Sequence, residues 1–551
     1  MSTAEVPANY DPYEPRPTVF QRHAPRITAV TVFVLTVLLG VISFPPFKTS
    51  EFAYAMLVPG TFWAYMRPRF KVYAWVMFAA QAVTWTILLG WLHNVTWGGL
   101  FLLGPFVGAW VGVWYLAAWW TLPQIVGRPS PVRLLVVLGL AGVWVLIEWT
   151  RTWFLGGFPW LPFAASQWER PSILQIAAYT GAYGISFVLV MLNIGFAAYA
   201  NRLFREGAKG LNKRSQEFFL ALFLLLACVS IHFTEAFNRR GQSEPLGRIA
   251  LVQPYIEQDV KWDPAKVPGI LETLRKTTLE AAKSRPDLML WPEAATPLAV
   301  RGHAQMTTFV EELVQQSKVP LLLGSVAIEK PNTPDEMWFN GVFLATPDAG
   351  LAQSYYMKRK LVPFGEFVPL RPVLGWLSKF VPIGEGDFVP GDNSSPMLVP
   401  IGGTPTIIGP LICYEDIYPQ LARASVLGGA TVLTVVTNNG WFGEGGAAYQ
   451  HAAHSVLRAV ETRRPIIRCG NGGWSGWIDE FGGVRGVVKN KDGTIYFRGA
   501  GLVNVTRDRR WKEAMTMYAQ YGDWFVLVSA GLAMFGIVLL RTGAPVVKTD
   551  S

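Results

Sequence analysis

The chain has little of the residues that build disulfide frameworks or nucleic-acid-binding surfaces. Its 551 residues include 3 cysteines, too few for a disulfide framework, and 6 histidines. Charged residues make up 16% of the sequence, and no basic stretch is interleaved with stacking aromatic residues. We therefore do not attribute the net charge of +10 to nucleic-acid binding. Internal repeats and low-complexity tracts are also missing.

Apolar residues, by contrast, are abundant. They make up 51% of the chain, with 23 Trp and 33 Phe. Crossing the roughly 30 Å hydrocarbon core of a bilayer takes about 20 apolar residues in a helix. Eight candidate spans, of which the second is short, lie at 27–44, 52–66, 72–93, 98–122, 132–150, 173–200, 216–234 and 523–541. The first stretch lacks a small-residue cleavage site, so we expect a retained helix and not a removed signal peptide.

The positions of lysine and arginine predict which side of the membrane each loop faces. With the N-terminus inside, the short cytoplasmic segments hold fifteen lysines and arginines, whereas the opposite short loops hold only Lys48, Arg151 and Arg170. This asymmetry fits the positive-inside rule with both termini cytoplasmic. Because the number of spans is even, the long segment before the last span is expected outside the cytoplasm.

Four parts result from this topology. We expect a cytoplasmic tail at 1–26, a seven-helix transmembrane region at 27–240, an extracytoplasmic domain at 246–515, and an eighth helix with a cytoplasmic tail at 520–551. Within the third part, strands are predicted at 248–253, 288–291, 319–325, 340–345, 354–357, 406–412, 431–437 and 465–469, and helices at 264–284, 304–317 and 449–462. Such alternation is typical of an α/β domain with a largely buried sheet.

The loop between the fifth and sixth spans is unusually rich in aromatic residues. From Glu148 to Phe163 it combines charges with a dense cluster of tryptophan and phenylalanine, as is common at a membrane interface. Both an aromatic belt and an entrance for a lipid substrate fit this composition. Glu148 and Arg151, three residues apart at a helix end, are expected to pair.

Cys413 stands at the end of an apolar run, directly before Tyr414 and two carboxylates. The carboxyl end of a strand is where α/β folds expose reactive groups, although a lone cysteine is more often a small core residue. A nucleophilic thiol also needs a base, and donors for the oxyanion that it creates. His451 and His454 are interpreted as polar residues of a helix, which disfavours a papain-like Cys-His pair.

Carboxylates and lysines at other strand ends are alternative partners for the thiol. Glu293 directly follows the strand at 288–291, and burial there would raise its pKa to suit a general base near neutral pH. Lys358 follows the strand at 354–357, and its ammonium could stabilise an oxyanion. Each residue taken singly is an ordinary surface residue.

The three positions together resemble the carbon–nitrogen hydrolase (nitrilase) superfamily. The resemblance rests on three sequence motifs, which are Trp-Pro-Glu-Ala at 291–294, Lys-x-x-Leu-Val-Pro-Phe-Gly-Glu-x-Val-Pro at 358–369 and Ile-Cys-Tyr-Glu at 412–415. It implies an αββα sandwich with a catalytic Glu-Lys-Cys set, here inserted between the seventh and eighth transmembrane helices.

With the spans and the loop motifs Glu-Trp-x-Arg at 148–151 and Gly-Phe-Pro-Trp at 157–160, residues 25–541 resemble the apolipoprotein N-acyltransferase family. This implies a monomeric enzyme of the bacterial inner membrane that needs no metal or organic cofactor. Such an enzyme moves an acyl chain from a phospholipid, usually phosphatidylethanolamine, to the α-amino group of the diacylglyceryl-modified N-terminal cysteine of a lipoprotein.

The resemblance also implies a role for each site residue. Glu293 would take the thiol proton, Cys413 would attack the phospholipid ester, and Lys358 with a backbone N–H would hold the oxyanion. The acyl chain would pass through a thioester in a ping-pong cycle. Glu366 is expected to position Lys358. Three further residues are expected near the site as substrate contacts, namely Trp262, Tyr414 and Glu415.

Two departures from the family leave acyl and head-group preference open. Residues 252–256 are Val-Gln-Pro-Tyr-Ile in place of Val-Gln-Gly-Asn-Ile, and residues 438–443 are Asn-Asn-Gly-Trp-Phe-Gly in place of Asn-Asp-Ala-Trp-Phe-Gly. Two other functions remain possible at this point. One is a membrane-tethered amidase of the nitrilase type acting on small amides, and the other is a membrane protein whose outer domain only binds a partner.

Overall fold

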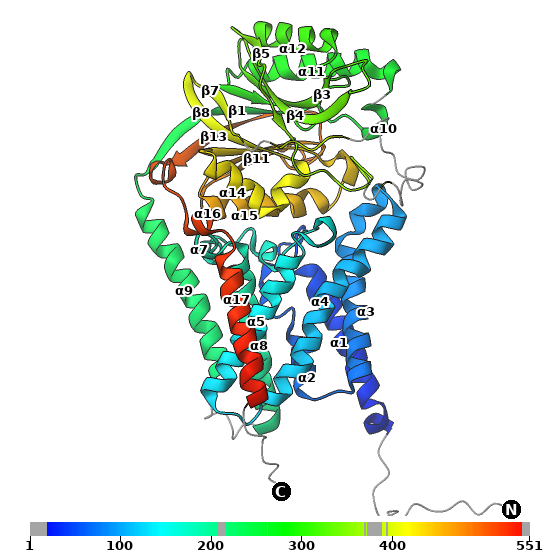
Figure 1. Ribbon diagram of the computed structural model, residues 1–551, viewed down its shortest axis with the longest axis vertical. Helices are drawn as coiled ribbons and strands as arrows, with labels where there is room; N and C mark the ends of the chain where they lie inside the picture. The colour runs from blue at the N-terminus through cyan, green and yellow to red at the C-terminus, as the bar shows by residue number, and fades with distance from the viewer. Residues whose placement is uncertain are drawn as a thin grey trace, which may run out of the picture.

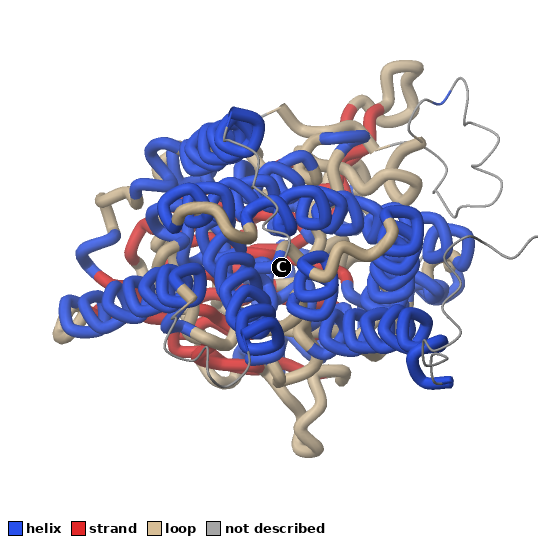
Figure 2. The backbone as a smooth tube through the Cα atoms, turned by 90° about the horizontal axis from the view of Figure 1, so that it is seen from below, coloured by secondary structure: helices blue, strands red, loops and turns tan. Residues whose placement is uncertain are grey.

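Long helices form one half of the molecule and an α/β domain forms the other (Figure 1). The computed structural model describes residues 19–206, 215–261, 263–368, 371, 388–392 and 395–542. Within these residues, α1 begins and α17 ends at the end of the helical half that lies furthest from the sheets (Figure 1). Seen from below, the helices cover the strands (Figure 2).

Within the described residues, seven long helices make up most of the helical half. They are α1 Val19–Ile42, α3 Phe70–Leu88, α4 Trp97–Ile125, α5 Ser130–Thr150, α8 Ala182–Glu206, α9 Gln216–Asn238 and α17 Trp524–Thr542. In the described part of the chain, 6 helices are both long enough and apolar enough to cross a membrane. Of the seven long helices, α3 is the one left out, because its 19 residues are long enough but not apolar enough. Short helices join them, namely α2 Val58–Tyr65, α6 Pro171–Leu174 and α7 Ala177–Thr180.

The predicted span at 52–66 is not one continuous helix. It consists of a 3₁₀ turn at Ser50–Tyr54 followed by α2, whose 8 residues rise only about 12 Å. The two ends of this segment nevertheless lie at opposite ends of the helical half. The Ser50 carbonyl accepts a hydrogen bond from Gln167, near the α/β domain, whereas Arg67 donates to the carbonyl of Pro123 at the far end of α4. The chain therefore runs from one end to the other as a broken helix.

The α/β domain contains two sheets. The first has 7 strands in the order β13-β1-β2-β3-β4-β5, with β6 paired to β4. Its strands are β1 Ser243–Gln253, β2 Leu288–Leu290, β3 Leu321–Glu329, β4 Met337–Thr346, β5 Gly350–Leu351, β6 Tyr356–Met357 and β13 Gly499–Asp508. The second has 6 strands in the order β12-β11-β10-β9-β8-β7. These are β7 Met397–Ile401, β8 Thr404–Ile412, β9 Val432–Asn438, β10 Ile466–Asn471, β11 Gly476–Ile478 and β12 Val484–Val487.

Helices cover the outer face of each sheet, which confirms the predicted αββα sandwich. The first sheet carries α11 Val267–Ala282 and α12 Ala304–Ser317, and the second carries α14 Pro419–Leu427 and α15 Ala447–Thr462. Apolar residues of both sheets, such as Leu251 and Val436, pack together in the core between them. The second helical layer lies against the membrane helices (Figure 1), which is why α15 is buried on nearly all sides. Two short helices, α10 Gln258–Lys261 and α16 Met517–Tyr521, lie in the connections.

Candidate active site

Cys413 lies at the point where β8 ends and a 3₁₀ turn begins. β8 runs parallel to the buried β9, so its last residue comes to the carboxyl edge of the second sheet. The backbone of Cys413 has φ +50°, a left-handed conformation that costs a residue with a side chain about 1 kcal/mol or more. Cys413 as a whole residue is 8% exposed. A sharp, strained turn thus sets the sulfur at the end of the strand.

Glu293 reaches the same place from the first sheet. It follows β2, is 6% exposed, and accepts hydrogen bonds from the Asn340 side chain at 2.8 Å and from the backbone N–H of Asn438 at 3.0 Å. β3 approaches this loop so closely that a Cβ on Gly324 would lie 2.7 Å from the Glu293 Cα. Only glycine at position 324 therefore allows the approach.

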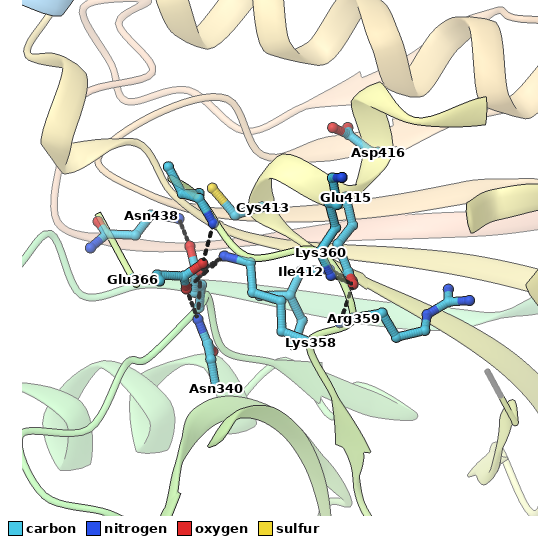
Figure 3. Close-up of polar contacts among 12 residues, drawn as sticks. Asn340, Lys358, Arg359, Lys360, Glu366, Ile412, Cys413, Glu415, Asp416 and Asn438 are labelled. Carbon is cyan, nitrogen blue, oxygen red and sulfur yellow. Dashed lines mark hydrogen bonds and ion pairs between the residues drawn. The ribbon is translucent and has the colours of Figure 1, made fainter. Parts of the chain in front are cut away.

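Lys358 lies between the carboxylates of Glu293 and Glu366, and Figure 3 shows its ammonium beside Glu366. Its Nζ is 2.9 Å from Glu293 Oε1 and 2.9 Å from Glu366 Oε1, and the residue is 1% exposed. Glu366 is held in turn by the Asn340 side chain and the backbone N–H of Val362. An ammonium has three donors, so these two ion pairs leave one N–H for another acceptor.

The electrostatics of Glu293 differ from the prediction made from its position. Burial acts to raise the pKa of Glu293, but the Lys358 ammonium and hydrogen bonds from Lys358, Asn340 and Cys413 outweigh burial, so its pKa lies below the ordinary 4.5. The predicted upward shift was therefore wrong. A sequence shows that a carboxylate is buried, whereas the cation that folds against it comes from a distant strand.

The other two members of the cluster shift upward. Burial raises the pKa of the Cys413 thiol to about 12, with Glu293 adding to the rise and Lys358 opposing it. Burial acts to lower the pKa of Lys358, but its two carboxylate partners hold that pKa well above 10.5. At neutral pH the site consequently holds a thiol, a carboxylate and an ammonium.

Tyr414 and Glu415 are held by hydrogen bonds to groups other than the Cys413 sulfur. The Tyr414 hydroxyl donates to the carbonyl of Gly157 at 3.0 Å, which ties the turn to the aromatic loop. The Glu415 carboxylate accepts from the Tyr356 hydroxyl and from the backbone N–H groups of Ile412 and Arg359. These contacts hold the chain around Cys413 and Lys358. Trp262 lies outside the described residues.

His451 and Asp416 form a buried support that reasoning from the sequence missed. His451 Nε2 is 2.8 Å from Asp416 Oδ1 and 3.1 Å from the Cys413 carbonyl oxygen. Both are acceptors, so Nε2 carries the proton and donates to the carbonyl at the strained turn. Asp416 also pairs with Arg468 at 2.6 Å and accepts from Ser455. The spacing of His451 and Ser455, four residues apart on one helix face, was the available signal.

The aromatic loop lies against this support, and it corrects a predicted ion pair. The ring centres of Trp160 and His451 are 5.5 Å apart, with the ring planes tilted by 41°. Glu148 accepts from the Trp144 indole and the Phe163 N–H, while Arg151 donates to the carbonyls of Phe158 and Trp160. Glu148 and Arg151 make no ion pair in the described structure. The loop folds back over the end of α5 and supplies each of them with nearer partners.

Two family models match this chain. The model described as carbon-nitrogen hydrolase matches residues 248–537, and that described as the apolipoprotein N-acyltransferase N-terminal domain matches residues 37–195. Apolipoprotein N-acyltransferase of Geobacter metallireducens is 34% identical over 75% of this chain and 76% of its own length. That of Pseudomonas aeruginosa is 31% identical over 74% of each chain. An amidase structure from Nesterenkonia sp. covers 48% of this chain and 92% of its own, with 18% identity and a TM-score of 0.35.

Proposed function

Because this chain belongs to the apolipoprotein N-acyltransferase family, we propose that Cys413 carries an acyl chain from a membrane phospholipid to the N-terminal amine of a lipoprotein. The observation that carries this mechanism is the buried cluster in which Lys358 bridges Glu293 and Glu366 beside the thiol (Figure 3). A covalent nucleophile, a base and a fixed cation are what a two-step acyl transfer needs.

In the first half-reaction the Cys413 sulfur attacks the carbonyl carbon of a phospholipid ester. Glu293 takes the thiol proton, and the free N–H of Lys358 stabilises the negative oxygen of the tetrahedral intermediate. The ester C–O bond then breaks, Glu293 returns the proton to the departing lysophospholipid, and a thioester remains. Because burial raises the pKa of the thiol to about 12, little thiolate is present at neutral pH, and we expect proton transfer to Glu293 to accompany the attack.

In the second half-reaction the α-amino group of a diacylglyceryl-cysteine attacks the thioester. The C–N bond forms and the C–S bond breaks. Glu293 takes the proton lost by the amine and gives it to the sulfur, which restores the thiol. The family implies this acceptor, and we propose phosphatidylethanolamine as the usual donor and a single chain as the active unit.

For the topology we propose eight crossings of the bacterial inner membrane, with both termini in the cytoplasm and the α/β domain, about 246–515, on the outer side. The charge asymmetry of the loops supports this orientation. The contacts at Ser50 and Arg67 support a second crossing through the broken helix. The apolar thickness that has to be crossed is about 30 Å, and α4 and α5, with 29 and 21 residues, are long enough for it.

Intact-mass measurement tests the proposal directly. The purified protein is incubated with a phospholipid and no acceptor, and we expect one acyl chain per protein, located on Cys413 by peptide mapping. Adding a diacylglyceryl peptide with a free N-terminus should discharge it. A protein that forms no adduct but releases ammonia from small amides would contradict this function and favour the tethered amidase.

The two half-reactions should differ in their pH dependence. Glu293 has a pKa below 4.5 and stays ionised above it, so acylation of Cys413 should be nearly constant from pH 5 to pH 8. Transfer needs a neutral α-amine, whose ordinary pKa is about 7.7–8.0, so it should slow about tenfold per pH unit below that value. Single-turnover mass spectrometry measures both steps. An acid limb near pH 6 in the acylation step would contradict the lowered pKa of Glu293.

A further inference from the structure

A second site is suggested by a cavity of about 470 Å³ where the α/β domain meets the outer end of α9. Its walls are the loop before α6, the last turns of α9, and the turn that joins β11 to β12. Pockets for small ligands range from about 300 to 1,000 Å³, so this one is large enough for a lipid head group.

This cavity is separate from the thiol site. None of Glu293, Lys358, Glu366 and Cys413 lines it. α15 lies between the two. His451, in the first turns of α15, contacts the Cys413 carbonyl. Later residues of α15 pack against Gly482 in the cavity wall, where an added Cβ would lie 2.8 Å from Val460. The cavity therefore takes no part in the reaction proposed above.

The cavity also opens beside a surface suited to acyl chains. Phe233 and Phe237 project from the outer turns of α9, and each is 67% exposed. Exposed aromatic side chains at the end of a membrane helix face lipid at the level where head groups begin. A phospholipid that lies along α9 would have its head group at the height of the cavity.

Charges in the wall are mostly neutralised by partners, with two exceptions. Three of them form ion pairs, which are Arg170 with Glu51 at 2.6 Å, Arg485 with Asp479 at 2.6 Å and Glu235 with Arg510 at 3.5 Å. Within the described ranges, neither Arg239 nor Glu169 makes an ion pair. The Arg239 guanidinium lies 5.1 Å from the Phe481 ring centre. One cation and one carboxylate are thus left in the same cavity wall.

We propose that this cavity binds the head group of an outer-leaflet phospholipid that is a phosphate–ammonium zwitterion. Arg239 donates to the phosphate, and Glu169 pairs with the ammonium. Guanidinium groups match phosphate oxygens with parallel N–H donors. The acyl chains of this lipid lie along Phe233 and Phe237, and the bound lipid stays intact because, among the described residues, no cysteine, serine or threonine lines the cavity. The outer-leaflet position rests on the topology proposed above.

Native mass spectrometry of the full chain in detergent tests this site. The Cys413→Ala variant serves as the background, so that lipids are counted without turnover and the result is independent of acyl transfer. Titration with an ethanolamine phospholipid should fill the site, and Arg239→Gln should weaken that binding about tenfold. Arg248→Gln is the control, because Arg248 is an exposed cation on β1 that does not line the cavity.

Glu169→Gln gives an independent readout of the ammonium contact. The parent should bind the ethanolamine lipid more tightly than a glycerol-head-group lipid with the same acyl chains, and Glu169→Gln should bind both equally. Equal binding by Arg239→Gln and its parent, or a parent that does not distinguish the two head groups, would overturn the proposal. Free phosphoethanolamine that binds as tightly as the lipid would also overturn it, since the ligand would then be a soluble zwitterion.

Discussion

Replacing Cys413 with alanine is expected to abolish the acyl adduct and to reduce acyl transfer by at least about a thousandfold, as is typical when the nucleophile of a catalytic set is removed. Alanine keeps most of the packing volume at the strained turn but has no atom that can form the thioester. Glu293 and Lys358 would remain paired at 2.9 Å. Transfer of a labelled acyl chain to a diacylglyceryl peptide measures the loss.

Cys469 provides the matched control for this substitution. It is also a buried, free cysteine, but it lies on β10 with its sulfur 3.4 Å from the Leu290 carbonyl, in the core between the sheets. Cys469→Ala should cost about 1 kcal/mol of stability, the cost of a small loss of buried volume, and should retain full activity. Retained transfer in Cys413→Ala, with Cys469→Ala behaving the same way, would rule out Cys413 as the acyl carrier.

Replacing Glu293 with glutamine is expected to slow acylation of Cys413 at least a hundredfold at pH 7, within the range of about 10²–10⁴ for a general base. The amide cannot accept the thiol proton, and its N–H₂ group faces the Lys358 ammonium in one of its two orientations. Removing the negative charge also removes one cause of the raised thiol pKa. The remaining reaction then depends on free thiolate.

The pH profile separates this loss of a base from a folding defect. Acylation in Glu293→Gln should rise about tenfold per pH unit between pH 7 and pH 9, because the thiolate fraction does so below the thiol pKa. The unsubstituted protein should show no such rise. Glu480→Gln is the control, since Glu480 is a buried carboxylate with a pKa near 7 that accepts from the Asp508 N–H, which an amide oxygen can also do. A flat profile in Glu293→Gln would contradict the role of general base.

Much of the fold followed from local sequence patterns. The predicted helix at 304–317 has the observed bounds of α12, and the strands at 248–253 and 406–412 lie within β1 and β8. Side-chain periodicity is a local property, so short windows carry it. Strand β13 was not predicted, because Gly499 and Gly501 weaken its strand pattern, and the segment is held as a strand by pairing with β1.

The candidate site shows where local information ends. The sequence by itself determined that Glu293, Lys358 and Cys413 each follow a strand. The sequence motifs around these three residues indicated the superfamily. Only the tertiary structure decided that Lys358 lies 2.9 Å from Glu293, which reverses the pKa shift that burial alone would cause. The contact of His451 with the Cys413 carbonyl likewise joins segments that are 38 residues apart in the chain.

The physical reason is the same in each case. Burial and strand position depend on the apolar pattern of neighbouring residues, which the sequence displays. Electrostatic free energy depends on distances of 3 to 6 Å between charges that packing brings together. Arg239 and Glu169, which make no ion pair within the described residues, face one cavity because the end of α9 and the loop before α6 meet there. The sequence determined which chemistry the chain carries, and the tertiary structure decided which charges act on it.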